Sequence, residues 1–160
     1  MEINDEEKKV LEHSPGLKGL IELEGDHEEF DYNGFHCVIN RVRVLRHLCG
    51  YVVIPEGHYL YKQPIFTIEN NYSIPAHGGI TFADFDNEGR YLIGFDCAHG
   101  GDVMPFIGDD DLPVGLYKNM SYVENNLKEI VDYIKKTDSA TKQKQSIKKY
   151  IYKGSIAQEV

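Results

Sequence analysis

Residues 77–102 read HGGITFADFDNEGRYLIGFDCAHGGD, and this stretch predicts a β-hairpin with polar residues at its open end. Residues 80–85 and 90–96 have a strand-forming composition, and the tetrad DNEG at 86–89 between them is typical of a tight turn. Because a hairpin joins antiparallel strands, the fold is expected to contain an antiparallel sheet.

The register of this hairpin decides which polar side chains meet. With the turn centred near Glu88, the numbers of paired residues add up to about 176, so that His77 faces His99 and Gly79 faces Cys97. Directly opposed side chains share one face of a sheet, about 4.5–5.5 Å apart at Cβ. A slip of one residue would send the two histidines to opposite faces.

Two imidazoles beside a thiol and a carboxylate fit three kinds of chemistry. His77 and His99 could bind zinc or another divalent metal, with Asp102 or Cys97 as a further ligand and a metal-bound hydroxide as nucleophile. Alternatively, Cys97 could act as a thiolate with a histidine as its base, or the group could bind a polar ligand without reaction. Structural histidines and a buried, inert cysteine are the plainer alternative. The spacing matches no specific metal motif, since CxxC and HExxH are absent.

Other residues near this hairpin are candidates for supporting roles. Gly78 and Gly79 would leave room for a ligand across from the thiol. Asp96 points to the other face of its strand and joins Cys97 and Asp102 as a candidate catalytic residue. Further candidates for substrate binding are His58, which follows the strand at 49–54, and Arg41, whose charge suits an anion.

Two more segments complete the predicted sheet. The nearly continuous apolar run Cys49–Ile54 is typical of a central strand. Upstream, Val42 and Val44 alternate with arginines, which predicts that the half-buried strand beginning near residue 35 continues through them.

The clearest helix is expected to start at Ser121, because Ser121 and Glu124 form a capping-box pattern. It carries an apolar stripe with helical spacing, made of Val123, Leu127, Ile130, Val131 and Ile134. The predicted fold class is therefore α+β, a small, mostly antiparallel sheet with a C-terminal amphipathic helix packed on one face. Residues 1–137 are expected to form a single domain, and residues 138–160 a lysine-rich, partly ordered extension.

Composition limits the classes of partner. The chain of 160 residues has a net charge of −9, which argues against a general nucleic-acid binder. No apolar run is long enough for a membrane span, and the polar, acidic start is not a secretory signal. Three cysteines do not make a disulfide framework, so we expect reduced thiols and a cytoplasmic location.

The motifs CGYV at 49–52, Gly57-His58, HGGIT at 77–81 and GFDCAH at 94–99 with Asp102 together resemble a group of small uncharacterised phage and prophage proteins. The resemblance covers roughly residues 35–135. Ile80 stands where that group has Leu, and Tyr59 stands where Pro is common; neither change affects a polar position. The resemblance implies a cytoplasmic protein of an infected bacterium, and it implies no activity.

Two functions follow as hypotheses. The first is a metal-dependent hydrolase of a nucleotide-like or otherwise phosphorylated small molecule, with His77, His99 and Asp102 as metal ligands. The second is a non-enzymatic binding protein that sequesters a host signalling nucleotide or inhibits a host protein. A homodimer is compatible with both hypotheses.

Overall fold

The computed structural model describes residues 4–6, 17–105 and 117–159, and it confirms the α+β class. One antiparallel sheet has the strand order β1-β2-β3-β5-β4. The elements in chain order are α2 (Leu17–Glu24), β1 (His27–Tyr32), β2 (Phe35–Arg41), β3 (Leu48–Ile54), α3 (Ile65–Asn71), β4 (Phe82–Phe85), β5 (Tyr91–Asp96) and α4 (Met120–Glu159).

The predicted hairpin register is confirmed, but the ladder is shorter than expected. Phe82 pairs with Gly94 and Phe85 with Tyr91. Before Phe82 the chain leaves the sheet, because the N–H of Gly79 donates to the carbonyl of Ala76 at 2.9 Å and closes a turn. The expected pairing of Gly79 with Cys97 is therefore wrong.

The run at 49–54 lies in β3, which is the middle strand of the sheet, as predicted. The predicted continuation of the preceding strand through Val42 and Val44 is wrong. Val42 donates its N–H to the carbonyl of His47 at 2.8 Å, and Arg46 has a φ of 65°, so the chain turns here. Val44 is 74% exposed as a result.

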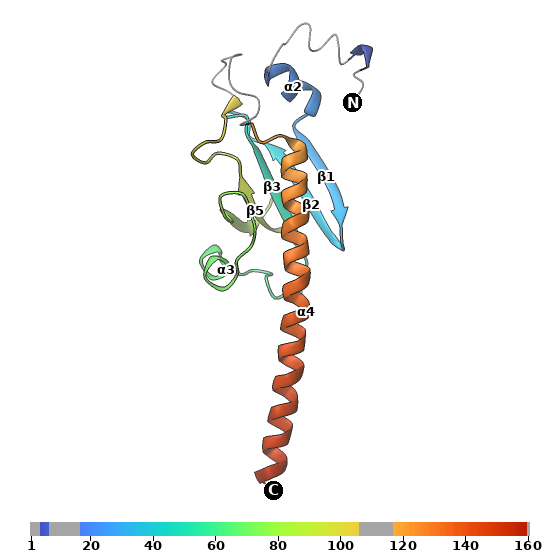
Figure 1. The fold of residues 1–160 in the computed structure, drawn as a ribbon, viewed down its shortest axis with the longest axis vertical. Helices are drawn as coiled ribbons and strands as arrows, with labels where there is room; N and C mark the ends of the chain where they lie inside the picture. The colour runs from blue at the N-terminus through green and yellow to red at the C-terminus, as the bar shows by residue number, and fades with distance from the viewer. Residues whose placement is uncertain (1–3, 7–16, 106–116, 160) are drawn as a thin grey trace.

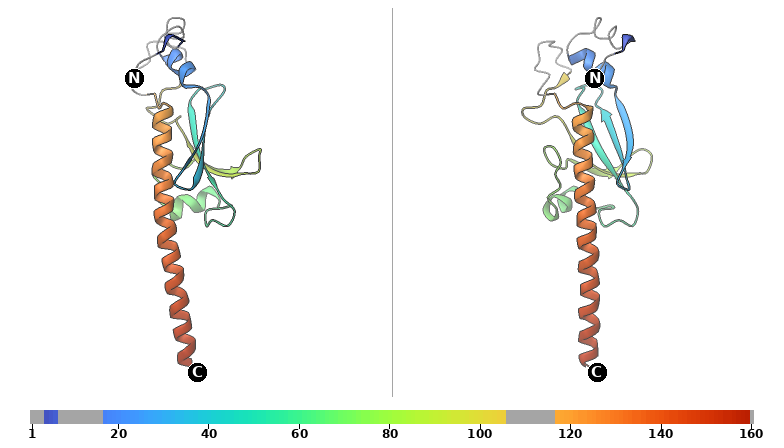
Figure 2. Two further views of the ribbon diagram at one scale, coloured as in Figure 1. Left: turned by 90° about the vertical axis from the view of Figure 1, so that its right-hand side faces the viewer. Right: turned by 45° about the vertical axis from the view of Figure 1, so that its right-hand side comes forward.

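α4 lies along one face of the sheet (Figure 2). All five residues of the predicted stripe are buried, together with sheet residues such as Ile39, Val52 and Ile93. Gly50 lets the helix come close, because a Cβ there would lie 2.8 Å from Val123 Cγ1. Burial of this apolar face accounts for most of the stability of a helix in such a position.

The start of α4 differs from the prediction by one residue, and its capping residue differs by two. The helix begins at Met120, and its cap is Asn119, whose side-chain oxygen accepts the N–H of Tyr122 at 2.9 Å. Asn and Ser are equally good caps, so the capping-box pattern alone did not fix the position.

α4 continues to Glu159 without a break at residue 138 and extends far beyond the sheet (Figure 1). Among the described side chains of α4, the last that belongs to the hydrophobic core is Ile134. Of the helices in the described residues, none combines the length and apolar character that a membrane crossing requires.

Candidate metal centre

His77, His99 and Asp102 come together beyond the end of β5. Each offers one ligand atom, and these atoms lie within 4.8 Å of one another. The predicted metal-binding residues therefore form one group that could hold a metal ion, although the β-ladder itself stops before reaching them. The rings of His77 and His99 are 5.5 Å apart between centroids.

The backbone of His77 is held by a turn and by α4. Gly78 has a φ of 68°, a left-handed conformation that glycine adopts without strain and that suits the third position of the turn from Ala76 to Gly79. The buried side chain of Asn126 accepts the N–H of His77 at 2.8 Å and donates to the carbonyl of Pro75 at 2.6 Å.

Both ring nitrogens of His77 have partners. Nδ1 lies 2.8 Å from the hydroxyl of Tyr122, and Nε2 lies 2.7 Å from Oδ2 of Asp102. Tyr122 and Asn126 stand one turn apart on α4, so one helix face orients both the ring and the backbone of this histidine. An imidazole fixed through one nitrogen presents the other in a defined direction, as metal-binding histidines do.

Asp102 folds back over its own turn. Its N–H donates to the carbonyl of His99 at 2.9 Å, and Gly101 has a φ of 91°. The carboxylate is 4% exposed and also accepts the N–H of His99 at 3.0 Å. Burial raises the pKa of the Asp102 carboxyl, but these hydrogen bonds and the charges of His77 and Lys118 outweigh it, so that the pKa lies below its ordinary value. Asp102 is therefore ionised at neutral pH.

The ring of His99 lies between two carboxylates. Its Nδ1 is 3.7 Å from Oδ2 of Asp102 and 3.7 Å from Oδ1 of Asp96. This nitrogen is buried and has no hydrogen-bond partner among the described residues. Distances of this size are too long for hydrogen bonds, but they fit two ligands of one cation.

Asp96 lies beside this group without belonging to it. Its carboxylate accepts the hydroxyl of Thr81 at 2.8 Å and the N–H of Ala98 at 3.0 Å. These bonds fix Asp96 next to His99, where it adds negative charge to the site.

Cys97 belongs to the hydrophobic core and is 2% exposed. Burial raises the pKa of its thiol far above the ordinary value, with the charge of Asp102 acting in the same direction. A thiol in this state is a poor nucleophile and a poor metal ligand, so the structure argues against both predicted roles of Cys97.

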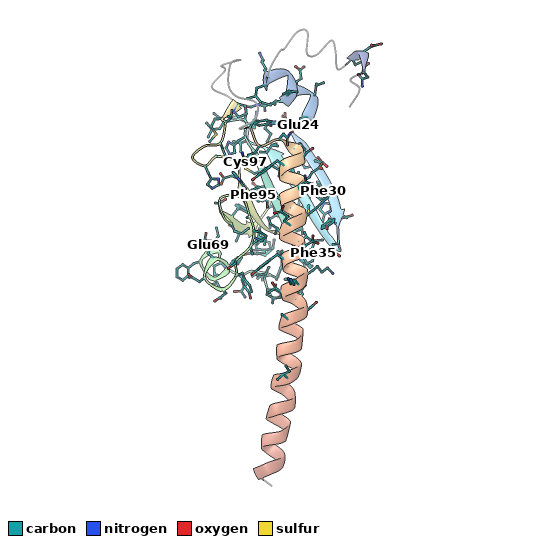
Figure 3. All side chains as sticks on the ribbon, viewed as in Figure 1. Glu24, Phe30, Phe35, Glu69, Phe95 and Cys97 are labelled. Carbon is teal, nitrogen blue, oxygen red and sulfur yellow. The ribbon has the colours of Figure 1, made fainter. Side chains whose placement is uncertain are left out.

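His58 lies at the opposite end of the sheet. Its ring is 5.7 Å from that of Phe35, and its Nε2 is 2.9 Å from Oδ1 of Asp138 on α4. Figure 3 shows Phe35, the ring neighbour of His58, and Cys97, which directly follows β5, at opposite ends of the sheet. The prediction that His58 lines the same site is therefore wrong, because β3 carries the residues that follow it away from the end of β5.

Arg41 lies at the end of the sheet that carries the candidate metal centre, but its side chain is already hydrogen-bonded within the chain. Its guanidinium is 0% exposed and donates to Glu24 at 2.8 Å, Asp26 at 2.9 Å and the hydroxyl of Tyr117 at 2.7 Å. These contacts tie β2 to the segment after α2, so the predicted role of Arg41 in substrate binding is not supported.

The two predicted glycine positions differ. A Cβ on Gly78 would collide with the ring of His99, whereas a Cβ on Gly79 would meet nothing within 4 Å. Gly78 therefore packs against a residue of the candidate metal centre, and of these two glycines only Gly79 borders open space.

Sequence reasoning missed Tyr122, Asn126 and His47. The spacing of Tyr122 and Asn126 puts both on one helix face, but nothing in the sequence says that this face meets residues 75–77. His47 comes directly before the central strand and is 6% exposed. Burial lowers the pKa of its imidazole against the opposing charges of Asp96 and Asp102.

No protein-family model matches this sequence, and neither the curated proteins nor the solved structures contain a significantly similar chain.

Proposed function

We propose that His77, His99 and Asp102 bind a divalent transition metal and that the chain is a metal-dependent hydrolase of a phosphorylated or nucleotide-like small molecule. The observation that carries the proposal is the convergence of three ligand atoms within 4.8 Å. Two imidazoles and one carboxylate are a typical ligand set for zinc and for neighbouring transition metals.

The partners of the three residues support metal binding. The hydroxyl of Tyr122 can accept the Nδ1–H of His77, which leaves the lone pair of Nε2 directed towards Asp102. Two electron pairs facing each other at 2.7 Å repel, and a shared cation removes this repulsion. In the alternative tautomer, Nε2–H donates to Asp102 and Tyr122 donates to Nδ1, which suits the metal-free protein.

Three protein ligands leave at least one position of the metal for an exchangeable ligand. A divalent metal lowers the pKa of bound water and polarises a phosphoryl oxygen. The chain would then hold the metal through His77, His99 and Asp102, and Tyr122 would fix the direction of the His77 ring. Hydrolysis adds water across a P–O bond, with hydroxide bonding to phosphorus and the leaving oxygen receiving the proton.

Metal analysis tests the proposal. We expect the purified wild type to contain or take up about one equivalent of Zn²⁺, Co²⁺ or Mn²⁺, and H77A and D102N to lose at least about tenfold in affinity. His36 supplies a matched control, because its Nδ1 lies 2.7 Å from Asp31 on the exposed surface, and His36 belongs to no candidate metal group among the described residues. H36A should bind metal like the wild type. Equal uptake by H77A and H36A would refute the proposed site.

A substrate panel then separates catalysis from sequestration. Metal-loaded protein would be incubated with phosphate mono- and diesters and with nucleotides. Product formation that H77A abolishes supports the hydrolase. A nucleotide that binds tightly and is recovered unchanged would instead support the binding-protein function.

A further inference from the structure

His47 is a buried histidine that is not part of the proposed metal centre. Its Nδ1 is buried and has no hydrogen-bond partner among the described residues, and the residue as a whole is 6% exposed. An unpaired buried polar atom costs stability, and a partner outside the chain, such as a bound ligand or ion, is one explanation for its presence.

The topology places His47 beside the metal centre. The carbonyl of Leu48 accepts the N–H of Cys97 at 3.0 Å, and Cys49 pairs with Asp96. The residue before Leu48 therefore lies next to the chain that leads into His99. Asp96, Asp102 and His99 are all close enough to act on the charge of the His47 ring.

His47 does not belong to the group of candidate metal ligands. The residues whose ligand atoms lie within 4.8 Å of one another do not include it. A metal-bound oxygen lies about 2.0–2.2 Å from the ion, and a hydrogen bond extends about 2.7–3.2 Å beyond it. A side chain that lies beside the ligand group without belonging to it is suited to contact an oxygen bound to the metal.

The charges around the site favour an anionic ligand once the metal is bound. A divalent ion and Lys118 oppose the carboxylates of Asp96 and Asp102, which leaves one net positive charge. Lys118 acts on Asp102 electrostatically, and its Nζ lies 5.3 Å from the ring centroid of Tyr122. No ion pair of Lys118 is present among the described residues, so its charge is available to the ligand.

We propose that His47 donates a hydrogen bond from Nδ1 to an oxygen of a phosphate or carboxylate group that is bound to the metal. The inference rests on the proposed metal centre and makes His47 a substrate-binding residue with specificity for oxyanions.

The test uses two variants of His47 in the full chain. In H47N a side-chain amide replaces Nδ1 and keeps a donor close to its position, whereas H47L removes the donor and fills the space. Protein loaded with Co²⁺ would be titrated with inorganic phosphate and, in parallel, with acetate, by the change in the visible spectrum. We expect similar Co²⁺ affinity in all three proteins, and phosphate binding that weakens about tenfold or more in H47L but less than about threefold in H47N. If acetate shows the same pattern, carboxylates share the site; if only phosphate does, the site selects phosphate.

Thermal unfolding of the metal-free proteins provides an independent measurement. Because H47L removes an unpaired buried nitrogen, its melting temperature should rise by about 2–4 °C, whereas a purely structural His47 would make H47L less stable. Equal phosphate affinity in the wild type and H47L, with Co²⁺ bound to both, would overturn this inference and leave the metal centre intact. Absence of Co²⁺ binding by the wild type would overturn both.

Discussion

The backbone of Gly78 lies against the imidazole ring of His99. A Cβ added to Gly78 would sit 2.2 Å from Cε1 and 2.3 Å from Nε2 of that ring, which no real side chain tolerates. Gly79 has a similar left-handed φ of 88°, and nothing lies within 4 Å of its added Cβ. Two adjacent glycines therefore share the same backbone requirement, but only one of them contacts the candidate metal centre.

This contact predicts that G78A and G79A have different effects. Both substitutions should destabilise the fold by about 1 kcal/mol, because alanine is strained at positive φ. Only G78A should displace the ring of His99, so its affinity for Zn²⁺ should fall by about tenfold or more. Calorimetric titration of both variants measures this difference. If G79A loses as much affinity as G78A, backbone strain alone explains the result and the packing argument fails.

The three thiols should be unreactive in the folded protein. Cys37, Cys49 and Cys97 are buried, and burial raises the pKa of each; that of Cys49 rises to about 11. Iodoacetamide at neutral pH should label none of them in buffer and all of them in urea, because alkylation requires an accessible thiolate. Rapid labelling of Cys97 in the native protein would reopen the case for a cysteine nucleophile.

Local patterns explain which parts of the site could be predicted from the sequence. The turn tetrad after Phe85 fixes the register of the hairpin, and the glycines before Asp102 allow that residue to fold back. Both are short-range effects, and they place His99 and Asp102 close to the chain that includes His77. The contacts that hold His77 itself come from its own turn and from α4.

Long-range topology explains what could not be predicted. Because β3 runs antiparallel to β5, with Cys49 opposite Asp96, the residue before β3 reaches the site and the residues after β3 do not. The sequence gives no sign that these two strands are neighbours, since α3 and β4 lie between them in the chain. For this reason His58 was wrongly expected at the site and His47 was missed.

The close approach of α4 to the sheet predicts a large cost for G50A. A Cβ on Gly50 would lie 2.8 Å from Val123 Cγ1 and 2.9 Å from the ring of Phe95. Overpacking of this kind should lower the free energy of unfolding by about 1–3 kcal/mol. V123A removes one of the two clashes, so the double variant should be more stable than the sum of the single effects by about 0.5–1 kcal/mol. Urea unfolding of the four proteins completes the cycle, and strict additivity would contradict the proposed contact.

Glu28 and Glu29 are neighbours on opposite faces of β1 and should respond oppositely to pH. A hydrogen bond with Glu124, followed by burial, raises the pKa of Glu28 from its ordinary 4.5 to about 7. Hydrogen bonds from Arg90 and His36 lower the pKa of Glu29 to about 2. The folded state therefore takes up a proton at Glu28 and releases one at Glu29, relative to the unfolded chain.

These pKa shifts predict how the stability of two glutamine variants depends on pH. The contribution of Glu28 to stability falls as pH rises from about 4.5 to 7. The free energy of unfolding of E28Q should therefore be about 1 kcal/mol higher than that of the wild type at pH 8, and the two values should be equal near pH 4. The contribution of Glu29 is present above its unfolded pKa and is lost as pH falls towards 2, so E29Q should be less stable than the wild type at pH 7, with a difference that shrinks on acidification. Denaturant unfolding at pH 4, 6 and 8 measures both trends. Parallel pH profiles for E28Q and E29Q would show that the Glu28–Glu124 pair does not share a proton in the folded protein.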